Sequence, residues 1–246
     1  MKQPSIFDNW AGSQPSKPSL ELRDYQSDAI DAVWDYMSDP STGNPLIVAP
    51  TGSGKSVILA GICHEAWKIK PGTRIMMLTH VQELVEQNEL TIRNYWNDAP
   101  VGVYSAGMKR KEAEAPIRFG GIQSVCRAVD KIGRADIVIV DEAHLIPKDG
   151  NGQYLSAFKA LKSMKPNLRV IGLTATPFRT DSGYLHKGAG ALFDDIVYDI
   201  PLLDLMDRGY ICRVTSKATR SHISVDGVAK VGGDFVGSQL EKSAMS

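Results

Sequence analysis

The sequence is poor in cysteine, in net charge and in long apolar runs. Its three cysteines, Cys63, Cys126 and Cys212, lie far apart and form no CxxC pair, which is typical of free thiols in a reducing compartment and argues against a zinc site. No apolar run approaches the roughly 18 residues of a membrane-spanning helix, and the N-terminus lacks a signal-peptide core. The 28 basic and 28 acidic residues cancel, so any contact with nucleic acid must come from a local patch.

What is present indicates a globular α/β protein. The chain has 246 residues, 43% of them hydrophobic and 23% charged, enough for one large domain or two small ones. Residues 1–18 are rich in Pro, Ser and Gln and predict a flexible arm. Residues 19–215 are the predicted domain. Residues 216–246, where regular patterning fades among glycines, are predicted to be an irregular tail or the start of a second domain.

Apolar runs and helical patterns alternate along the domain. Helical spacing begins between Glu21 and Met37. Strands are then predicted at 46–49, 74–79, 101–104, 117–122, 136–140 and 169–174, and helices at 55–69, 81–96, 124–131, 153–164 and 202–208. Near-continuous apolar strands that alternate with helices predict a doubly wound, mostly parallel sheet. The loops that follow its strands should meet at one edge, where such sheets bind ligands.

The segment APTGSGKS, residues 49–56, lies between a predicted strand and a predicted helix. Gly52 and Gly54 allow positive φ, so successive amides can point at an anion beside the helix N-terminus. Lys55 can reach the outer phosphates of a nucleotide, and the Ser56 hydroxyl can bind Mg²⁺. The pattern G-x-x-x-x-G-K-[ST] has Ala49 in place of its first Gly. The alternative is an ordinary Gly-rich turn. The predicted phosphate-binding residues are Pro50, Thr51, Gly52, Ser53, Gly54, Lys55 and Ser56.

The segment DIVIVDEAH ends a predicted strand with two acidic residues. Asp141 can hold Mg²⁺ opposite Ser56, and Glu142 can orient or deprotonate an attacking water. The alternative is a solvated acidic turn. Lys55, Asp141 and Glu142 are therefore the predicted catalytic residues.

These segments resemble the motifs of superfamily 2 helicases. APTGSGKS, DEAH at 141–144 and LTATP at 173–177 resemble motifs I, II and III, and RDYQ at 23–26 resembles the adenine-reading segment. LTHVQELVEQ at 78–87 and GGIQSV at 120–125 resemble nucleic-acid contact segments. Within the superfamily, TATPFR, AHLI, RGYICRV and above all YSAGMKRKE resemble the RadD-type branch, near restriction motors and XPB-like helicases. The resemblance implies a RecA-like domain with ATP and Mg²⁺ as cofactors.

The resemblance also implies residue roles. Gln26 would read the adenine edge, with Arg23 or Tyr25 stacking or packing nearby. His144, Thr174 and Thr176 would couple phosphate state to nucleic acid, although His144 can equally be structural. The nucleic-acid contacts would be Thr79, His80, Gly121, Gln123 and Ser124, with helix capping as the alternative for Thr79. The cluster KRK at 109–111 is either a nucleic-acid contact or a solvated face.

For the protein as a whole, the resemblance implies a DNA helicase or translocase. It would act in DNA repair, in the cytoplasm of a bacterial or phage-infected cell. Such motors have a second RecA-like domain, yet the sequence shows no second set of strands, no arginine-rich motif and no cysteine cluster after residue 215. We therefore expect an N-terminal part of a longer motor that turns over slowly in isolation. An RNA helicase and a nucleotide-dependent strand-binding module are the alternatives.

A short pattern in the arm has its own interpretation. QPSIF, residues 3–7, resembles the peptide that binds the bacterial sliding clamp, with Gln3 as a hydrogen-bonding residue and Ile6 and Phe7 as apolar anchors. Pro4 stands where an aliphatic residue is usual. The alternative is a disordered start without a partner.

Overall fold

The computed structural model describes residues 14–147, 152–179, 183–188, 190–213, 230–231 and 234–235. Its main element is an eight-stranded sheet of order β10-β1-β7-β6-β2-β5-β3-β4, parallel except that β4 runs antiparallel to β3. The strands are β1 Pro45–Val48, β2 Ile75–Thr79, β3 Val101–Ser105, β4 Arg110–Lys111, β5 Ile117–Gly121, β6 Ile137–Asp141, β7 Arg169–Thr174 and β10 Asp195–Asp199. The predicted doubly wound α/β sheet is confirmed.

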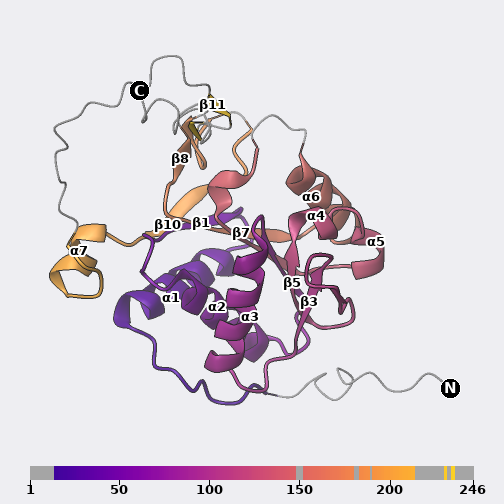
Figure 1. The fold of residues 1–246 in the computed structure, drawn as a ribbon, viewed down its shortest axis with the longest axis horizontal. Helices are drawn as coiled ribbons and strands as arrows, with labels where there is room; N and C mark the ends of the chain where they lie inside the picture. The colour runs from indigo at the N-terminus through magenta and orange to yellow at the C-terminus, as the bar shows by residue number, and fades with distance from the viewer. Residues whose placement is uncertain are drawn as a thin grey trace, which may run out of the picture.

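Helices cover both faces of the sheet (Figure 1). They are α1 Asp24–Ser38, α2 Lys55–Ile69, α3 Gln82–Tyr95, α4 Ile122–Val125, α5 Val129–Ile132, α6 Gln153–Met164 and α7 Leu202–Asp207, with a 3-10 turn at Ala143–Leu145. In β6, Ile137 and Ile139 join the core under α1, α2 and α3, whereas Val138 and Val140 join the core under α4, α5 and α6. Because alternate residues face opposite layers, a strand buried on both sides must be apolar throughout. Within the described residues, no helix is both long and apolar enough to cross a membrane.

Several elements of the structure differ from the sequence prediction. The single helix predicted at 124–131 is wrong: α4 and α5 are separate turns, broken at Ala128, whose φ of −138° and ψ of 20° leave the helix. Strand β10 was not predicted, because its sequence DIVYD is short, flanked by Asp and only half-buried at the sheet edge. The two-residue strand β4 was also not predicted. In the predicted tail 216–246, the described residues pair as two short antiparallel strands, β11 Lys230–Val231 and β12 Asp234–Phe235.

The described part of the predicted arm, residues 14–18, is joined to the domain by hydrogen bonds. The Ser16 carbonyl lies 3.0 Å from Nε2 of His64 on α2, and just beyond it the Ser19 amide donates to the Tyr95 carbonyl at 2.8 Å. The His64 ring packs edge-on against Trp96, with centroids 5.2 Å apart. This segment therefore contacts the second half of α2 and the C-terminal end of α3.

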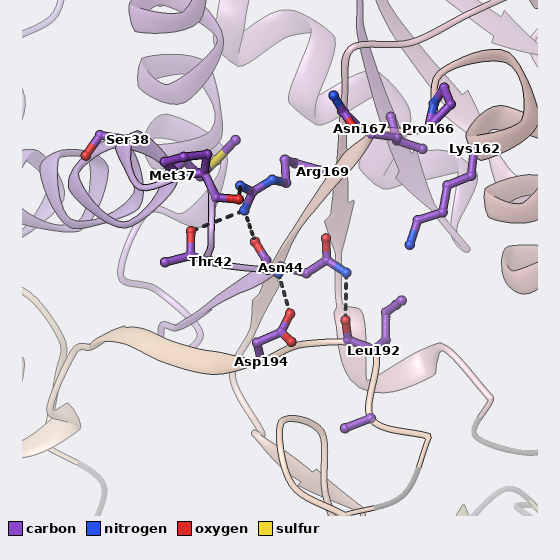
Figure 2. Close-up of a pocket in the computed structure, with 14 residues that line it drawn as sticks. Met37, Ser38, Thr42, Asn44, Lys162, Pro166, Asn167, Arg169, Leu192 and Asp194 are labelled. Atoms are coloured by element: carbon purple, nitrogen blue, oxygen red, sulfur yellow. Dashed lines mark hydrogen bonds between the residues drawn. The ribbon is translucent and has the colours of Figure 1, made fainter.

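A cavity of about 740 Å³ lies where β1 and β7 begin, at the sheet edge opposite the phosphate loop (Figure 2). Its polar side chains brace the strands. Arg169 donates to the Gly43 carbonyl at 2.6 Å, and the Asn44 side chain donates to the Leu192 carbonyl at 2.8 Å and accepts from the Val170 amide at 2.9 Å. Asn44 thus ties β1 to β7 and to the segment before β10.

Further antiparallel pairing occurs after β7. Strands β8 Phe178–Arg179 and β9 Gly183–Tyr184 form a small ladder. The ladder comes directly after Thr174 and Thr176 in the chain, and so begins at the carboxyl end of β7.

Candidate functional site

The loop between β1 and α2 has the backbone geometry expected of a phosphate-binding turn. Gly52 and Gly54 adopt φ of 87° and 83°, a region that side chains disfavour. The Ser53 side chain is buried, and its hydroxyl donates to the Pro50 carbonyl at 2.7 Å. Because α2 begins at Lys55 and Gly54 makes no side-chain cap, the first amides of this helix are available to an anion.

Asp141 ends β6 beside this loop and is 3% exposed. Its Oδ2 accepts a hydrogen bond from Asn88 Nδ2 at 3.0 Å, and its Oδ1 accepts from the Glu142 amide at 3.1 Å. Burial raises the pKa of the Asp141 carboxyl, and the Asn88 hydrogen bond opposes that rise. The carboxylate is therefore fixed in orientation and open to stabilisation by a cation.

Glu142 is held between two basic side chains. Lys55 Nζ lies 3.5 Å from its Oε1, and His144 Nδ1 lies 3.3 Å from its Oε2. The hydrogen bond with His144, followed by the charge of Lys55, lowers the pKa of Glu142 despite its partial burial. Glu142 also adopts φ of 55°, uncommon for a residue with a side chain. Its carboxylate is thus ionised and aimed at the lysine of the phosphate loop.

A polar chain continues from His144 to the end of β7. His144 Nδ1 lies 3.0 Å from the Thr174 hydroxyl, which is fully buried. The Thr176 amide donates to the same hydroxyl at 3.1 Å. Arg179 donates from Nε to the His144 carbonyl at 2.8 Å and from Nη2 to the Ile146 carbonyl. The predicted coupling residues therefore form one chain of contacts, from Thr176 through Thr174 to His144, and His144 reaches Glu142.

Residues 23–26 contact the phosphate loop at the start of α1. The Ser53 carbonyl accepts hydrogen bonds from Tyr25 Oη at 2.9 Å and from Gln26 Nε2 at 3.1 Å, and Gln26 Oε1 accepts from the Arg23 amide at 3.0 Å. A Cβ on Gly54 would lie 2.5 Å from Gln26 Nε2. Gln26 is only 4% exposed, so its first role here is to set the shape of the loop.

The residues predicted to hold Mg²⁺ provide suitable donors. Asp141 offers a fixed carboxylate, and Ser56 lies in the first turn of α2, next to Lys55. Hydroxyl and carboxylate oxygens are the hard ligands that Mg²⁺ takes together with substrate phosphates and water. The buried negative charge of Asp141 fits a cation at this position.

Most of the predicted nucleic-acid contacts line one groove of about 390 Å³. Its walls include His80, Gly121, Gln123 and Ser124, together with Lys111, Arg127 and Lys131. The three basic residues are exposed. The Ser124 hydroxyl accepts from the Ala106 amide at 2.9 Å, which fixes the β3–β4 turn against α4.

Two sequence interpretations at this groove need correction. Thr79 is fully buried, and α3 has Val81 as its N-cap with no side-chain cap, so Thr79 neither caps the helix nor lines the groove. Within KRK, Arg110 lies 2.6 Å from Glu89 and 2.8 Å from Glu112. Arg110 therefore anchors β4 to α3, and of this cluster only Lys111 lines the groove.

Sequence reasoning missed four residues of this region: Asn88, Arg179, Arg127 and Lys131. Asn88 had a usable signal, because it occupies a buried position of the amphipathic helix α3 and a buried polar side chain needs a partner. The others carry no local signal that separates them from ordinary surface cations.

The fold and the arrangement of Lys55, Asp141 and Glu142 define a RecA-like P-loop nucleotide-binding domain. Residues 19–179, more than half of the chain, match the family model described as "Type III restriction enzyme, res subunit". The chain belongs to this family. The proteins that it resembles support the assignment of a superfamily 2 helicase motor domain.

Two curated relatives illustrate the match. The chain is 26% identical over 231 residues to the DNA 3'-5' translocase XPB2 of Sulfurisphaera tokodaii, covering 91% of this chain and 47% of that protein. It is 25% identical over 229 residues to the type I restriction enzyme EcoAI endonuclease subunit of Escherichia coli, covering 89% and 26%. The chain thus spans less than half of the length of these relatives.

Two solved structures share the fold. The Pyrococcus furiosus Hef helicase domain aligns with a TM-score of 0.51 and 25% identity, covering 69% of this chain and 37% of that one. The Sulfolobus solfataricus SWI2/SNF2 ATPase core in complex with dsDNA aligns with a TM-score of 0.55 and 21% identity, covering 73% and 36%.

Proposed function

We propose that this chain is the first RecA-like domain of an ATP-hydrolysing DNA helicase or translocase. The observation that carries the proposal is the contact between Lys55 of the phosphate loop and Glu142 at the end of β6, 3.5 Å apart. A binding cation and a candidate base meet there beside a carboxylate that suits Mg²⁺. The helicase and translocase relatives support the same activity.

Each residue has a distinct proposed task. Lys55 and the amides of residues 52–56 bind the β- and γ-phosphates. Ser56 and Asp141 hold Mg²⁺, which, when bound, neutralises charge on the phosphates. Glu142 orients the attacking water and takes its proton. His144, Thr174 and Thr176 transmit the loss of the γ-phosphate, because His144 touches both Glu142 and Thr174.

The groove beside α4 is the proposed contact with the nucleic-acid backbone. His80, Gly121, Gln123 and Ser124 line it together with three exposed cations. Amides, hydroxyls and cations suit phosphates rather than base edges, so binding should fall with salt and show little sequence preference. DNA is favoured over RNA because the XPB2 relative is named a DNA translocase.

We further propose the RadD-type branch and a role in DNA repair, which rest on the segments YSAGMKRKE and RGYICRV. A second RecA-like domain would follow residues 216–246 in the longer protein, and cytoplasmic action follows from such a role. This chain covers 47% and 26% of the two relatives, and their greater length supports further domains.

Binding of a sliding clamp through Gln3–Phe7 is a separate proposal, and these residues lie outside the described part of the chain. A peptide of residues 1–12 titrated against a bacterial clamp tests it. Saturable binding that is lost on Phe7→Ala would support it. Unchanged binding by the Phe7→Ala peptide, or none at high micromolar concentration, would discard it.

Hydrolysis assays test the main proposal against its alternatives. ATP hydrolysis by this chain and by the longer parent protein is measured with single-stranded DNA, duplex DNA and RNA, with Glu142→Gln as the control. Turnover stimulated by DNA more than by RNA supports a DNA motor, and the reverse favours an RNA helicase. Nucleotide-dependent strand binding without turnover in the parent would show a binding module instead.

A further inference from the structure

The four residues after α7 fold back onto the nucleotide site. The amides of Tyr210 and Ile211 both donate to the Leu205 carbonyl, at 2.8 and 3.2 Å. Gly209 makes the reversal possible with φ of 73°. The returning segment meets residues 23–26 at the other end of the domain sequence, and Ile211 lies 3.5 Å from the position of a Cβ on Gly52. This segment therefore closes one side of the phosphate loop.

At this contact, two arginines lie against one tyrosine ring. The guanidinium carbon of Arg23 is 4.3 Å from the centroid of the Tyr210 ring, and that of Arg208 is 4.9 Å from it. Tyr25 packs against Tyr210 with centroids 5.6 Å apart. Planar guanidinium groups prefer to stack on aromatic faces, and Arg23 lies within stacking distance of the Tyr210 ring.

The two arginines differ in their charge partners. Arg208 Nη2 lies 2.6 Å from a carboxylate oxygen of Asp24, and Nη1 lies 3.5 Å from Asp204. In the part of the chain that the structure describes, no carboxylate lies within 4.0 Å of Arg23. The charge of Arg208 is thus balanced by two carboxylates. Arg23 is exposed and has no such partner among the described residues.

Arg23 is also linked to the phosphate loop. It donates from Nη1 to Tyr25 Oη at 3.0 Å, and Tyr25 Oη donates to the Ser53 carbonyl at 2.9 Å. With the phosphates of a nucleotide at Lys55, a planar cation at this place is suited to stack on the base.

We propose that Tyr210 is a positioning residue for the base of the bound nucleotide: it holds the Arg23 guanidinium flat on one face, so that the opposite face stacks on a purine. The inference rests on the proposed nucleotide site and extends it to a segment after α7. It concerns the base alone, because Tyr210 makes no contact with Lys55 or Glu142 among the described interactions.

The experiment separates the base from the phosphates. Dissociation constants for ATP and for inorganic tripolyphosphate, both with Mg²⁺, are measured on residues 1–246 as wild type, Tyr210→Leu and Tyr210→Phe. Leu keeps apolar volume but removes the aromatic face. We expect Tyr210→Leu to weaken ATP roughly three- to fivefold, the size of one cation–π stack, with tripolyphosphate unchanged. Tyr210→Phe should bind both ligands like wild type.

Tyr184→Leu is the control, because Tyr184 is another tyrosine beside a cation, Lys187, but it is exposed on the β8–β9 ladder, away from Arg23. It should leave both constants unchanged. Equal loss of ATP and tripolyphosphate in Tyr210→Leu, or unchanged ATP binding, would overturn the inference while leaving the nucleotide site intact. Failure of the wild type to bind ATP would instead overturn the proposed function and this inference with it.

Discussion

At the residue scale, Lys55 and Glu142 touch each other but should fail in different ways when changed. Lys55→Ala removes a cation that binds phosphate, so ATP affinity should fall roughly ten- to a hundredfold. Glu142→Gln keeps size and position but cannot accept a proton from water, so it should retain ATP binding and lose hydrolysis. Equilibrium binding and single-turnover hydrolysis measure the two effects. Equal loss of binding in both variants, with circular dichroism unchanged, would contradict these roles.

The lowered pKa of Glu142 predicts a pH-dependent contribution to stability. His144 and Lys55 hold its pKa below the ordinary value of 4.5, so its ionised form stabilises the fold above that pH. The contribution is lost as the pH falls through the folded pKa. Glu142→Gln should therefore melt a few degrees below wild type at pH 7. The difference should shrink as the pH falls below 4.5 and through the lowered folded-state pKa, where wild-type Glu142 becomes protonated.

Thermal melts of both proteins from pH 7 to pH 3.5 check this expectation. A variant that melts at the same temperature as wild type at pH 7 would show that the Glu142 carboxylate is not stabilised by its neighbours.

At the element scale, the start of α2 depends on a glycine for two reasons. Gly54 has φ of 83°, and a Cβ there would lie 2.5 Å from Gln26 Nε2. Gly72, in the turn after α2, has nearly the same φ of 85°, with nothing within 4 Å of the added Cβ. Gly72→Ala should thus cost only the backbone strain, about 1–2 kcal/mol. Gly54→Ala should cost more and also weaken ATP binding, because Gln26 must move.

Urea unfolding of the two variants gives the comparison. Equal losses of unfolding free energy would show that Gln26 yields without penalty and does not shape the loop.

A second prediction at the element scale concerns DNA binding by the α4–α5 segment. Arg127 and Lys131 lie on the groove wall without assigned roles in the fold. Changing both to Gln should weaken DNA binding and reduce the slope of log affinity against log salt by roughly one per lost phosphate contact. Lys159→Gln, an exposed lysine on α6, is the control. An unchanged salt slope in the double variant would show that the groove is not part of the nucleic-acid interface.

At the scale of the whole molecule, the relevant fact is that the chain covers less than half of the relatives described above. Related phosphoryl-transfer enzymes gain roughly 10³–10⁵ in turnover from an arginine supplied by another domain or protein. We therefore expect residues 1–246 alone to hydrolyse ATP slowly, with little stimulation by DNA. Steady-state ATPase assays of this chain beside its longer parent test the point, and rapid DNA-stimulated turnover by the chain alone would contradict it.

Local patterns in the sequence were sufficient to predict the layers of the fold and the positions of the phosphate loop and acidic pair. Residues 49–56 and 141–144 could be recognised from the sequence, because the shape of the loop and the position of the strand end are set by residues that are neighbours in the chain. The break between α4 and α5 could not be predicted from the sequence, because the pattern of a short segment such as 122–132 fits one helix or two separate turns equally well. The edge strand β10 likewise gains its identity only from pairing with β1.

The sequence by itself determined that this protein has a strand-and-helix sheet with a phosphate loop and two acidic residues, because those features depend on residues close together in the chain. Only the tertiary structure decided that Asn88 orients Asp141, that Arg110 pairs with Glu89 rather than facing the groove, and that Tyr210 lies against Arg23. Each of these contacts joins separate elements whose proximity depends on the order of the strands and the packing of the helices. No local pattern carries that information.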